Sequence, residues 1–90
     1  MSVEIHIPQA FQHITEGKKV IEVPVGNTVG DCINELIKLY PKIKEEIFKG
    51  DKLRDHIEIY LNMQSTYPEE LLKKVNDGDK IHIITMLAGG

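Results

Sequence analysis

The fold of this chain is decided by one stretch of its sequence, Thr28-Val29-Gly30-Asp31-Cys32-Ile33-Asn34-Glu35-Leu36-Ile37-Lys38-Leu39-Tyr40-Pro41. Apolar side chains recur in it with the spacing of one helical face, at Val29, Cys32, Ile33, Leu36, Ile37 and Tyr40. Thr28 is the expected N-cap, Asp31 completes a short capping box, and Pro41 ends the helix. We therefore predict one amphipathic helix that buries its apolar face.

Four other segments alternate apolar and polar residues with the period of two that is typical of a half-buried strand. They cover residues 3–7, 21–25, 57–61 and 81–85. Pro24 predicts that the second strand lies at a sheet edge or contains a bulge. Two strands, the helix and two further strands, in that order, predict an α+β fold with the helix packed on a small mixed sheet.

The segments between these elements predict loops and turns. Residues 9–19 and 63–68 are expected to be loops. Residues 42–48 and 69–75 are each expected to hold a short helix or helical turn, the second with Leu71, Leu72 and Val75 as its apolar contacts. Asn76-Asp77-Gly78-Asp79 predicts a tight turn into the last strand.

Length and composition predict a single domain over residues 1–90, globular rather than disordered. Lys and Arg number 11 against 14 Asp and Glu, and this slightly acidic balance argues against a nucleic-acid partner. A single cysteine excludes an internal disulfide. No apolar run approaches the roughly 18 residues of a membrane span, and no signal peptide is visible. We expect a cytoplasmic protein with no membrane partner.

The interior of the sequence offers little that could carry catalysis. The histidines His6, His13, His56 and His82 lack the helical spacing of metal ligands, so no metal is predicted, and those on strands are expected to be solvated. Cys32 lies on the apolar helix face, where a thiol packs as a small hydrophobe. No glycine-rich phosphate loop is present. We expect a chain that is not an enzyme by itself.

The unusual feature is the end of the sequence, Thr85-Met86-Leu87-Ala88-Gly89-Gly90. Two glycines directly after a strand make a thin tail that fits a narrow channel. Such a tail presents its carboxylate to a partner's active site, where adenylation by ATP would make it reactive toward a sulfur or nitrogen nucleophile. The alternative is an inert, frayed terminus.

Several stretches resemble the MoaD/ThiS family of sulfur carriers, which have the ubiquitin-like β-grasp fold. They are the helix start Thr28–Leu36, the helix end Tyr40-Pro41, the strand Ile57-Glu58-Ile59-Tyr60-Leu61-Asn62, the turn Asp77-Gly78-Asp79-Lys80-Ile81 and the pair Gly89-Gly90. Together they span nearly the whole chain. The resemblance implies a β-grasp fold and a carrier function.

For this chain the resemblance implies that Gly90 is the reactive residue and that Gly89 and Ala88 form the tail. An adenylating enzyme of the ubiquitin-activating type would use ATP on the Gly90 carboxylate, and a persulfide protein would supply the sulfur of a thiocarboxylate. No cofactor is expected on the chain itself. Its length and Tyr40-Pro41 favour the MoaD side, the small subunit of molybdopterin synthase, with a larger subunit as sulfur acceptor in molybdenum-cofactor biosynthesis.

Other functions stay open at this point. Many members of the family have a proline where this chain has Thr85-Met86-Leu87. A ThiS-like carrier for thiamine thiazole or amino-acid sulfur is therefore an alternative. A modifier joined through Gly90 to lysines of other proteins needs the same residues. A plain interaction module with an inert tail is the third alternative.

The period of the last strand predicts a docking surface. If Ile81 and Ile83 face the helix, then Ile84 and Met86 face the other way. We expect Ile84, Met86 and Leu87, with Tyr60, to form an apolar patch for a partner protein. The alternative is that Ile84 is an isolated surface residue.

Overall fold

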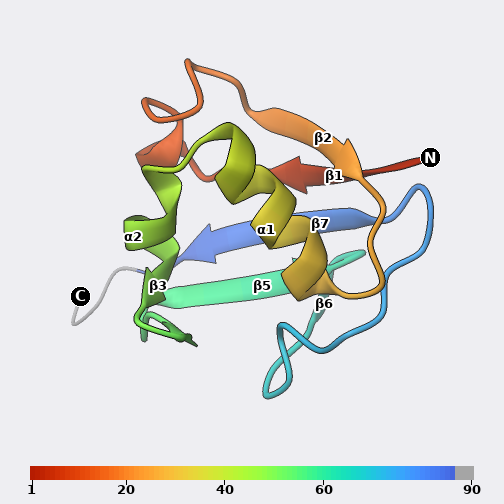
Figure 1. Cartoon of the computed structure of the whole chain (residues 1–90). Helices are drawn as coiled ribbons and strands as arrows, with labels where there is room; N and C mark the ends of the chain where they lie inside the picture. The colour runs from red at the N-terminus through yellow and green to blue at the C-terminus, as the bar shows by residue number, and fades with distance from the viewer. Residues whose placement is uncertain (87–90) are drawn as a thin grey trace.

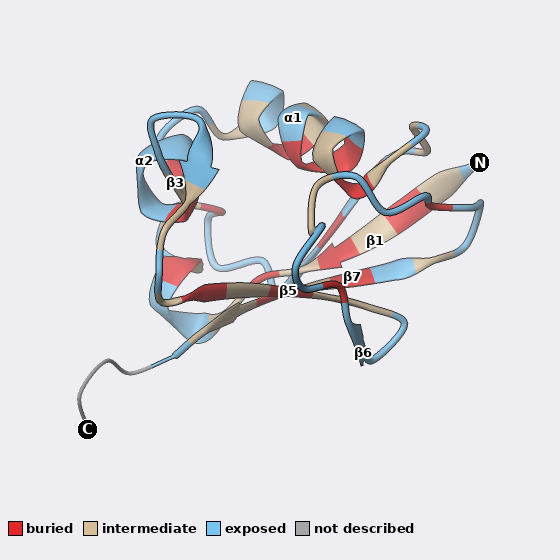
Figure 2. Ribbon diagram, turned by 90° about the horizontal axis from the view of Figure 1, so that it is seen from below, coloured by how far each residue is buried: buried red, intermediate tan, exposed pale blue. Residues whose placement is uncertain are grey.

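The computed structural model describes residues 1–86 of the 90-residue chain. Five strands form a mixed sheet in the order β2-β1-β7-β5-β6 (Figure 1). Their bounds are Ser2–His6 (β1), Val20–Pro24 (β2), Ile57–Leu61 (β5), Gln64–Ser65 (β6) and Lys80–Thr85 (β7). Helix α1 (Val29–Leu39) packs across one face of this sheet, and the shorter α2 (Ile43–Ile47) lies on the same side (Figure 2). The α+β prediction is confirmed.

Strand β7 lies in the middle of the sheet although it is last in sequence. It pairs parallel to β1 and antiparallel to β5, while β1 pairs antiparallel to β2. Strand β2 is therefore an edge strand, as Pro24 near its end predicted, because proline cannot donate a ladder hydrogen bond. The first and last segments of the described chain are joined by this central pairing.

Helix α1 begins at the predicted capping box. The backbone N–H of Asp31 donates to Thr28 Oγ1 (3.2 Å), and the Asp31 carboxylate accepts from the backbone N–H groups of Thr28 (3.1 Å) and Asn27 (2.9 Å). At the other end the N–H of Tyr40 donates to the carbonyl of Leu36, and Pro41 follows. Both ends of the helix are thus set by local side-chain chemistry.

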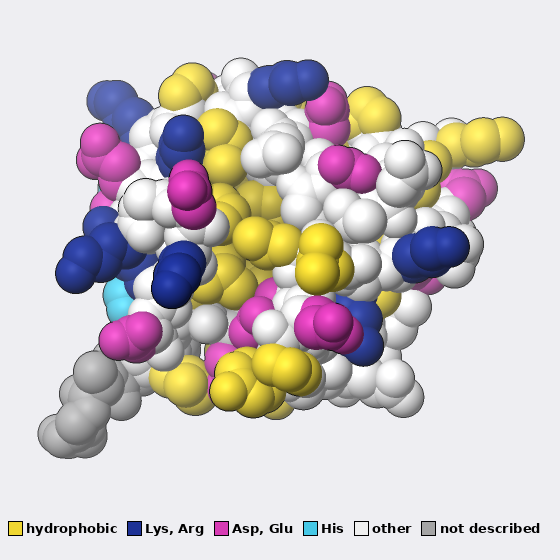
Figure 3. All heavy atoms as spheres, turned by 60° about the horizontal axis from the view of Figure 1, so that its bottom comes forward, with side chains coloured by type: hydrophobic (Ala, Val, Ile, Leu, Met, Phe, Trp, Pro, Cys, Tyr) yellow, Lys and Arg dark blue, Asp and Glu magenta, His cyan; other side chains and the backbone are white. Residues whose placement is uncertain are grey.

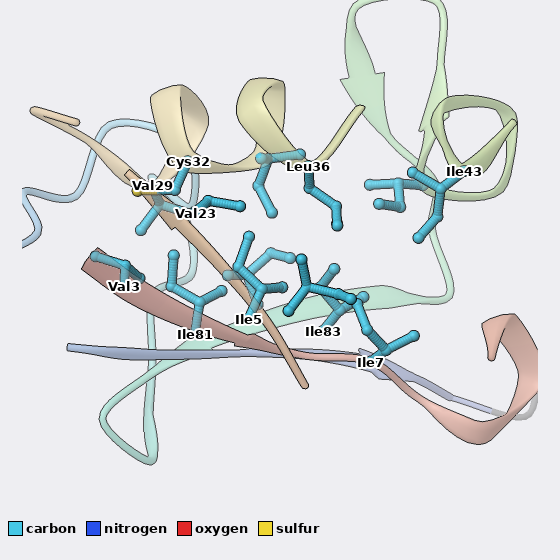
Figure 4. Close-up of a cluster of buried hydrophobic side chains, with 14 of the residues drawn as sticks. Val3, Ile5, Ile7, Val23, Val29, Cys32, Leu36, Ile43, Ile81 and Ile83 are labelled. Carbon is cyan, nitrogen blue, oxygen red and sulfur yellow. The ribbon is translucent and has the colours of Figure 1, made fainter. Parts of the chain in front are cut away.

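The core lies between α1 and the sheet. In Figure 4 the apolar side chains of α1 point toward those of β1 and β7. The fully or almost fully buried hydrophobic residues are Val3, Ile5, Ile7, Phe11, Ile21, Val23, Val29, Cys32, Ile33, Leu36, Ile43, Ile47, Ile57, Ile59, Val75, Ile81 and Ile83. The alternation of β1, β2, β5 and β7 and the helical period of α1 predicted most of this set.

Three segments expected to be simple loops or turns contain more structure. The 3-10 turn η1 (Gln9–Phe11) places Phe11 in the core. Strands β3 (Phe48–Lys49) and β4 (Lys52–Leu53) form a small hairpin after α2. Strand β6 pairs antiparallel with the end of β5. Each of these strands has only two residues, too few to give a period in the sequence.

The prediction for residues 69–75 is confirmed as a helical turn with Val75 buried, but it is wrong for Leu72. One turn forms, in which the N–H of Leu72 donates to the carbonyl of Glu69 (2.9 Å), but no helix follows, and Leu72 is 71% exposed. The reason is that this segment's carbonyls serve α1. Leu71 accepts from the N–H of Gly30 (3.0 Å) and Lys73 from the N–H of Val29 (2.9 Å). These helix N-terminal donors have no partner within α1.

Gly30 allows that close approach. A Cβ atom at this position would lie 3.0 Å from the carbonyl oxygen of Leu71, so a larger residue would push the loop away from the helix start. The loop and α1 are therefore packed through backbone atoms, a contact that periodicity cannot reveal.

Candidate functional site

Strand β7 carries the chain toward its last residues. Its hydrogen bonding to β5 continues one residue past the strand, because the N–H of Met86 donates to the carbonyl of His56 (2.7 Å). The expected docking residue Leu87 and the expected tail residues Ala88, Gly89 and Gly90 lie outside the described residues. The structure thus locates the last residue before the tail beside the start of β5.

The two faces of β7 differ as the strand period predicted. Ile81 and Ile83 are 0% and 3% exposed and lie in the core. On the opposite face, which we call the outer face, His82 and Ile84 are half-buried. Met86, beyond the end of the strand, is 46% exposed.

Neighbouring strands supply the rest of the outer face. Tyr60 of β5 lies directly opposite His82 in the antiparallel register, and Glu58 lies opposite Ile84. Tyr60 and Ile84 are therefore diagonal neighbours on one face, a separation that aromatic side chains can span. The expected residues Tyr60 and Ile84 do share this face, with a carboxylate and an imidazole among them, and Met86 follows directly after the strand.

A pair of histidines at the centre of this face was missed. His6 of β1 and His82 of β7 are register partners, and their rings stack with centroids 4.1 Å apart and planes 15° from parallel. The expectation that both are solvated is wrong, since both are half-buried. Nothing in the sequence could reveal the pair, because it depends on parallel pairing of the first and last strands.

The environment of His82 favours its neutral form. Its Nδ1 atom is buried and has no hydrogen-bond partner among residues 1–86. Burial lowers the pKa of His82, and the nearby His6 and Lys80 lower this pKa further. On the other side of the stack, His6 Nε2 lies 3.2 Å from a carboxylate oxygen of Glu4. The outer face therefore holds a titratable pair with one weakly basic member.

Cys32 is confirmed as a core residue. It is fully buried on the face of α1 that packs on the sheet, and burial raises the pKa of its thiol. A protonated, inaccessible thiol is a poor nucleophile. Within the described part of the chain, no group of three or more His, Cys, Asp or Glu side chains could hold a metal ion. Cys32 therefore acts as a packing residue of the core.

Comparison with known proteins identifies the family. A model described as the ThiS family matches residues 5–90. The chain belongs to the ThiS family. These proteins are ubiquitin-like sulfur carriers and modifiers of the ThiS, CysO, SAMP and MoaD-like kind, small carriers that are generally non-enzymatic.

Solved structures of ThiS-family relatives have the same fold. A chain of the Amycolatopsis orientalis BexX/CysO complex is 31% identical with a TM-score of 0.88, and the match covers 98% of this chain and 99% of that one. SAMP1 from Haloferax volcanii is 25% identical with a TM-score of 0.85, and both chains are fully covered. The putative molybdopterin converting factor subunit 1 of Pyrococcus furiosus is 25% identical with a TM-score of 0.64, covering 97% and 99%. The β-grasp prediction is confirmed.

A helix that crosses a membrane must be both long and apolar. None of the helices among the described residues combines the length and the apolar character that crossing a bilayer requires.

Proposed function

We propose that this chain is a sulfur carrier whose Gly90 carboxylate is adenylated and then converted to a thiocarboxylate. The observation that carries the proposal is the position of Met86, which is hydrogen-bonded to β5 only four residues before Gly90. The sheet thus serves as a rigid handle for a short tail that ends in two glycines. Membership of the ThiS family supports the same function.

The chemistry needs two partner proteins. In an adenylating enzyme of the ubiquitin-activating type, a Gly90 carboxylate oxygen attacks the α-phosphorus of ATP, and pyrophosphate leaves. The terminal sulfur of a donor protein's persulfide then attacks the acyl carbon and displaces AMP, giving an acyl disulfide. A further thiol attacks the donor's sulfur, which forms an ordinary disulfide and releases the thiocarboxylate. The chain contributes the carboxylate and the docking surface.

The docking surface in this proposal is the outer face around Tyr60, Ile84 and Met86, continued by Leu87. These residues lead directly toward the tail and combine apolar groups with polar neighbours, as protein interfaces do. An activating enzyme that binds them would hold Gly90 at a fixed distance from ATP.

As sulfur acceptor we propose the large subunit of a molybdopterin synthase. The likeness to the Pyrococcus furiosus protein supports this choice. The alternative is another sulfur acceptor, in thiazole or amino-acid synthesis, and the chain is also similar to a chain of the BexX/CysO complex, whose description names no molybdopterin protein. A single-turnover assay distinguishes the two acceptors. The thiocarboxylated chain is mixed with each purified acceptor enzyme and its substrate, and the transfer of sulfur is measured.

A second candidate function is protein modification, with Gly90 joined to lysines of other proteins. The likeness to SAMP1, described as small archaeal modifier protein 1, favours it. Both functions use the same activated carboxylate, so they differ only in the nucleophile that attacks it.

Intact-mass analysis of the protein isolated from its native cells tests the proposal. We expect the mass change of one oxygen replaced by sulfur, located in the C-terminal peptide and absent after deletion of Gly90. Larger adducts that also vanish on this deletion indicate modification of other proteins. A chain without either change, whose Gly89-Gly90 deletion restores full growth of a null strain, would contradict both functions.

A further inference from the structure

A second feature is a groove that adjoins the outer face, with which it shares Glu58. It runs between the β3–β4 region and the loop of residues 67–72 (Figure 3). Met86 is one of its lining residues. Its volume is about 790 Å³. Its apolar lining consists mainly of Leu53, Ile57, Tyr67, Leu71, Leu72 and Met86.

This groove exposes large apolar side chains. Tyr67 is 75% exposed, Leu72 71% and Met86 46%, and all three contribute to its lining. Seven large hydrophobic side chains are exposed among the described residues, so nearly half of them gather here. A gathering of this kind marks a surface that is covered by another molecule.

The charged residues around the groove are mostly acidic. The lining includes two cations, Lys52 and Arg54, and five carboxylates, which belong to Asp51, Asp55, Glu58, Glu69 and Glu70. None of these carboxylates takes part in an ion pair within residues 1–86. Arg54 is held in place, since its Nε donates to the carbonyl of Glu45 (2.7 Å). The groove therefore combines an apolar lining with an excess of unpaired negative charge.

These properties restrict the occupant. A second copy of this chain carries a net charge of −3 and is repelled. The chain's own tail, Leu87-Ala88-Gly89-Gly90, has no basic side chain to offer the carboxylates and ends in a carboxylate of its own. Nucleic acid is repelled as well. A segment with apolar residues interspersed among Lys or Arg fits both the lining and the charge.

We propose that this groove binds a basic amphipathic segment of a partner protein, whose apolar side chains cover Tyr67 and Leu72 while its cations face Glu69 and Glu70. The binding does not depend on sulfur chemistry at Gly90, so it stands or falls separately from the proposed function. Because Met86 lines the groove, a partner held there also lies beside the start of the tail.

A titration of the full ¹⁵N-labelled chain with a peptide of repeating Leu-Lys-Lys-Leu units tests the proposal. We expect shift changes centred on residues 51–58 and 67–72, and weaker binding in high salt. Changes centred on His82 and Tyr60, or no saturable binding to the wild-type chain, would overturn it. A peptide with Glu in place of every Lys is expected not to bind.

Two matched double variants separate local from general charge. E69Q/E70Q removes an adjacent glutamate pair at the groove, and we expect affinity to fall about fivefold. E45Q/E46Q removes an adjacent, exposed glutamate pair on α2 outside the groove, and affinity should stay unchanged. Equal losses in both variants would show that only net charge matters and would overturn the proposal. L72S is expected to weaken binding about tenfold while the spectrum stays that of a folded chain.

Discussion

The two faces of the central strand β7 differ in composition and in burial. On the inner face Ile81 and Ile83 are buried against α1, so their environment is entirely apolar. On the outer face His82 and Ile84 are half-buried next to Tyr60, Glu58 and their strand neighbours. The same six-residue strand thus has a buried face that stabilises the fold and a partly exposed face that we propose for recognition, because successive side chains of a strand point to opposite faces.

The largest effect on stability is expected from a substitution in the core that covers the inner face of β7. Leu36→Ala deletes a fully buried side chain of α1 above the sheet, and the cavity it leaves should cost about 2–5 kcal/mol of unfolding free energy. Urea denaturation followed by circular dichroism measures the loss. A loss below about 1 kcal/mol would mean that α1 and the sheet are not packed as described.

The cap of α1 is expected to contribute less. Thr28→Ala removes the side chain that accepts from the N–H of Asp31 and should lower the unfolding free energy by about 1 kcal/mol. Thr28→Ser keeps the acceptor and serves as the matched control in the same denaturation experiment. Equal losses in the two variants would assign the effect to the lost methyl group rather than to the cap.

The pH dependence probes the outer face. The pKa of His82 in the folded chain lies below its ordinary 6.5, so below that pH the unfolded chain binds a proton that the folded chain does not. The contribution of neutral His82 to the stability of the folded chain is complete above about pH 6.5 and is lost as the pH falls toward the folded-state pKa. Unfolding measured between pH 7.5 and 5 should therefore show a loss of stability that is smaller in H82Q. H13Q, at an exposed position outside the sheet, should behave as the wild type.

The smallest effect on stability, and the clearest separation of the faces, is expected from Ile84→Lys. Lysine at this position faces Glu58 across the strands, so stability should change by no more than about 0.5 kcal/mol. Pyrophosphate exchange with the activating enzyme should nevertheless fall, because the docking patch is interrupted. Unchanged exchange in a folded I84K chain would remove Ile84 from the proposed interface.

Local patterns in the sequence predicted the elements whose structure is set by residues close together in the chain. The helical period and the Thr28–Asp31 box located α1, and the alternation of β1, β2, β5 and β7 gave the buried side of each strand. The same alternation correctly assigned Ile84 to the face opposite the core. The docking role of Ile84 and Met86 and the chemistry of Gly90 stay predictions.

Elements that depend on distant partners were not predictable. The loop after β6 gives its carbonyls to the N-terminus of α1 and so forms no helix of its own. Phe11, in a segment without periodicity, finds its place in the core only when η1 packs there. In both cases the partner lies far away in the sequence, so no window of local residues contains the cause.

The sequence by itself determined the helix, the strand faces and the glycine pair at its end, because each follows from short-range spacing and side-chain chemistry. Only the tertiary structure decided which strands are neighbours. Parallel pairing of β1 and β7 stacks His6 on His82, and the approach of the 67–72 loop to the β3–β4 region forms the acidic groove. Such contacts join segments that are not neighbours in the sequence, and their free energy comes from burial and pairing that exist only once the sheet has formed.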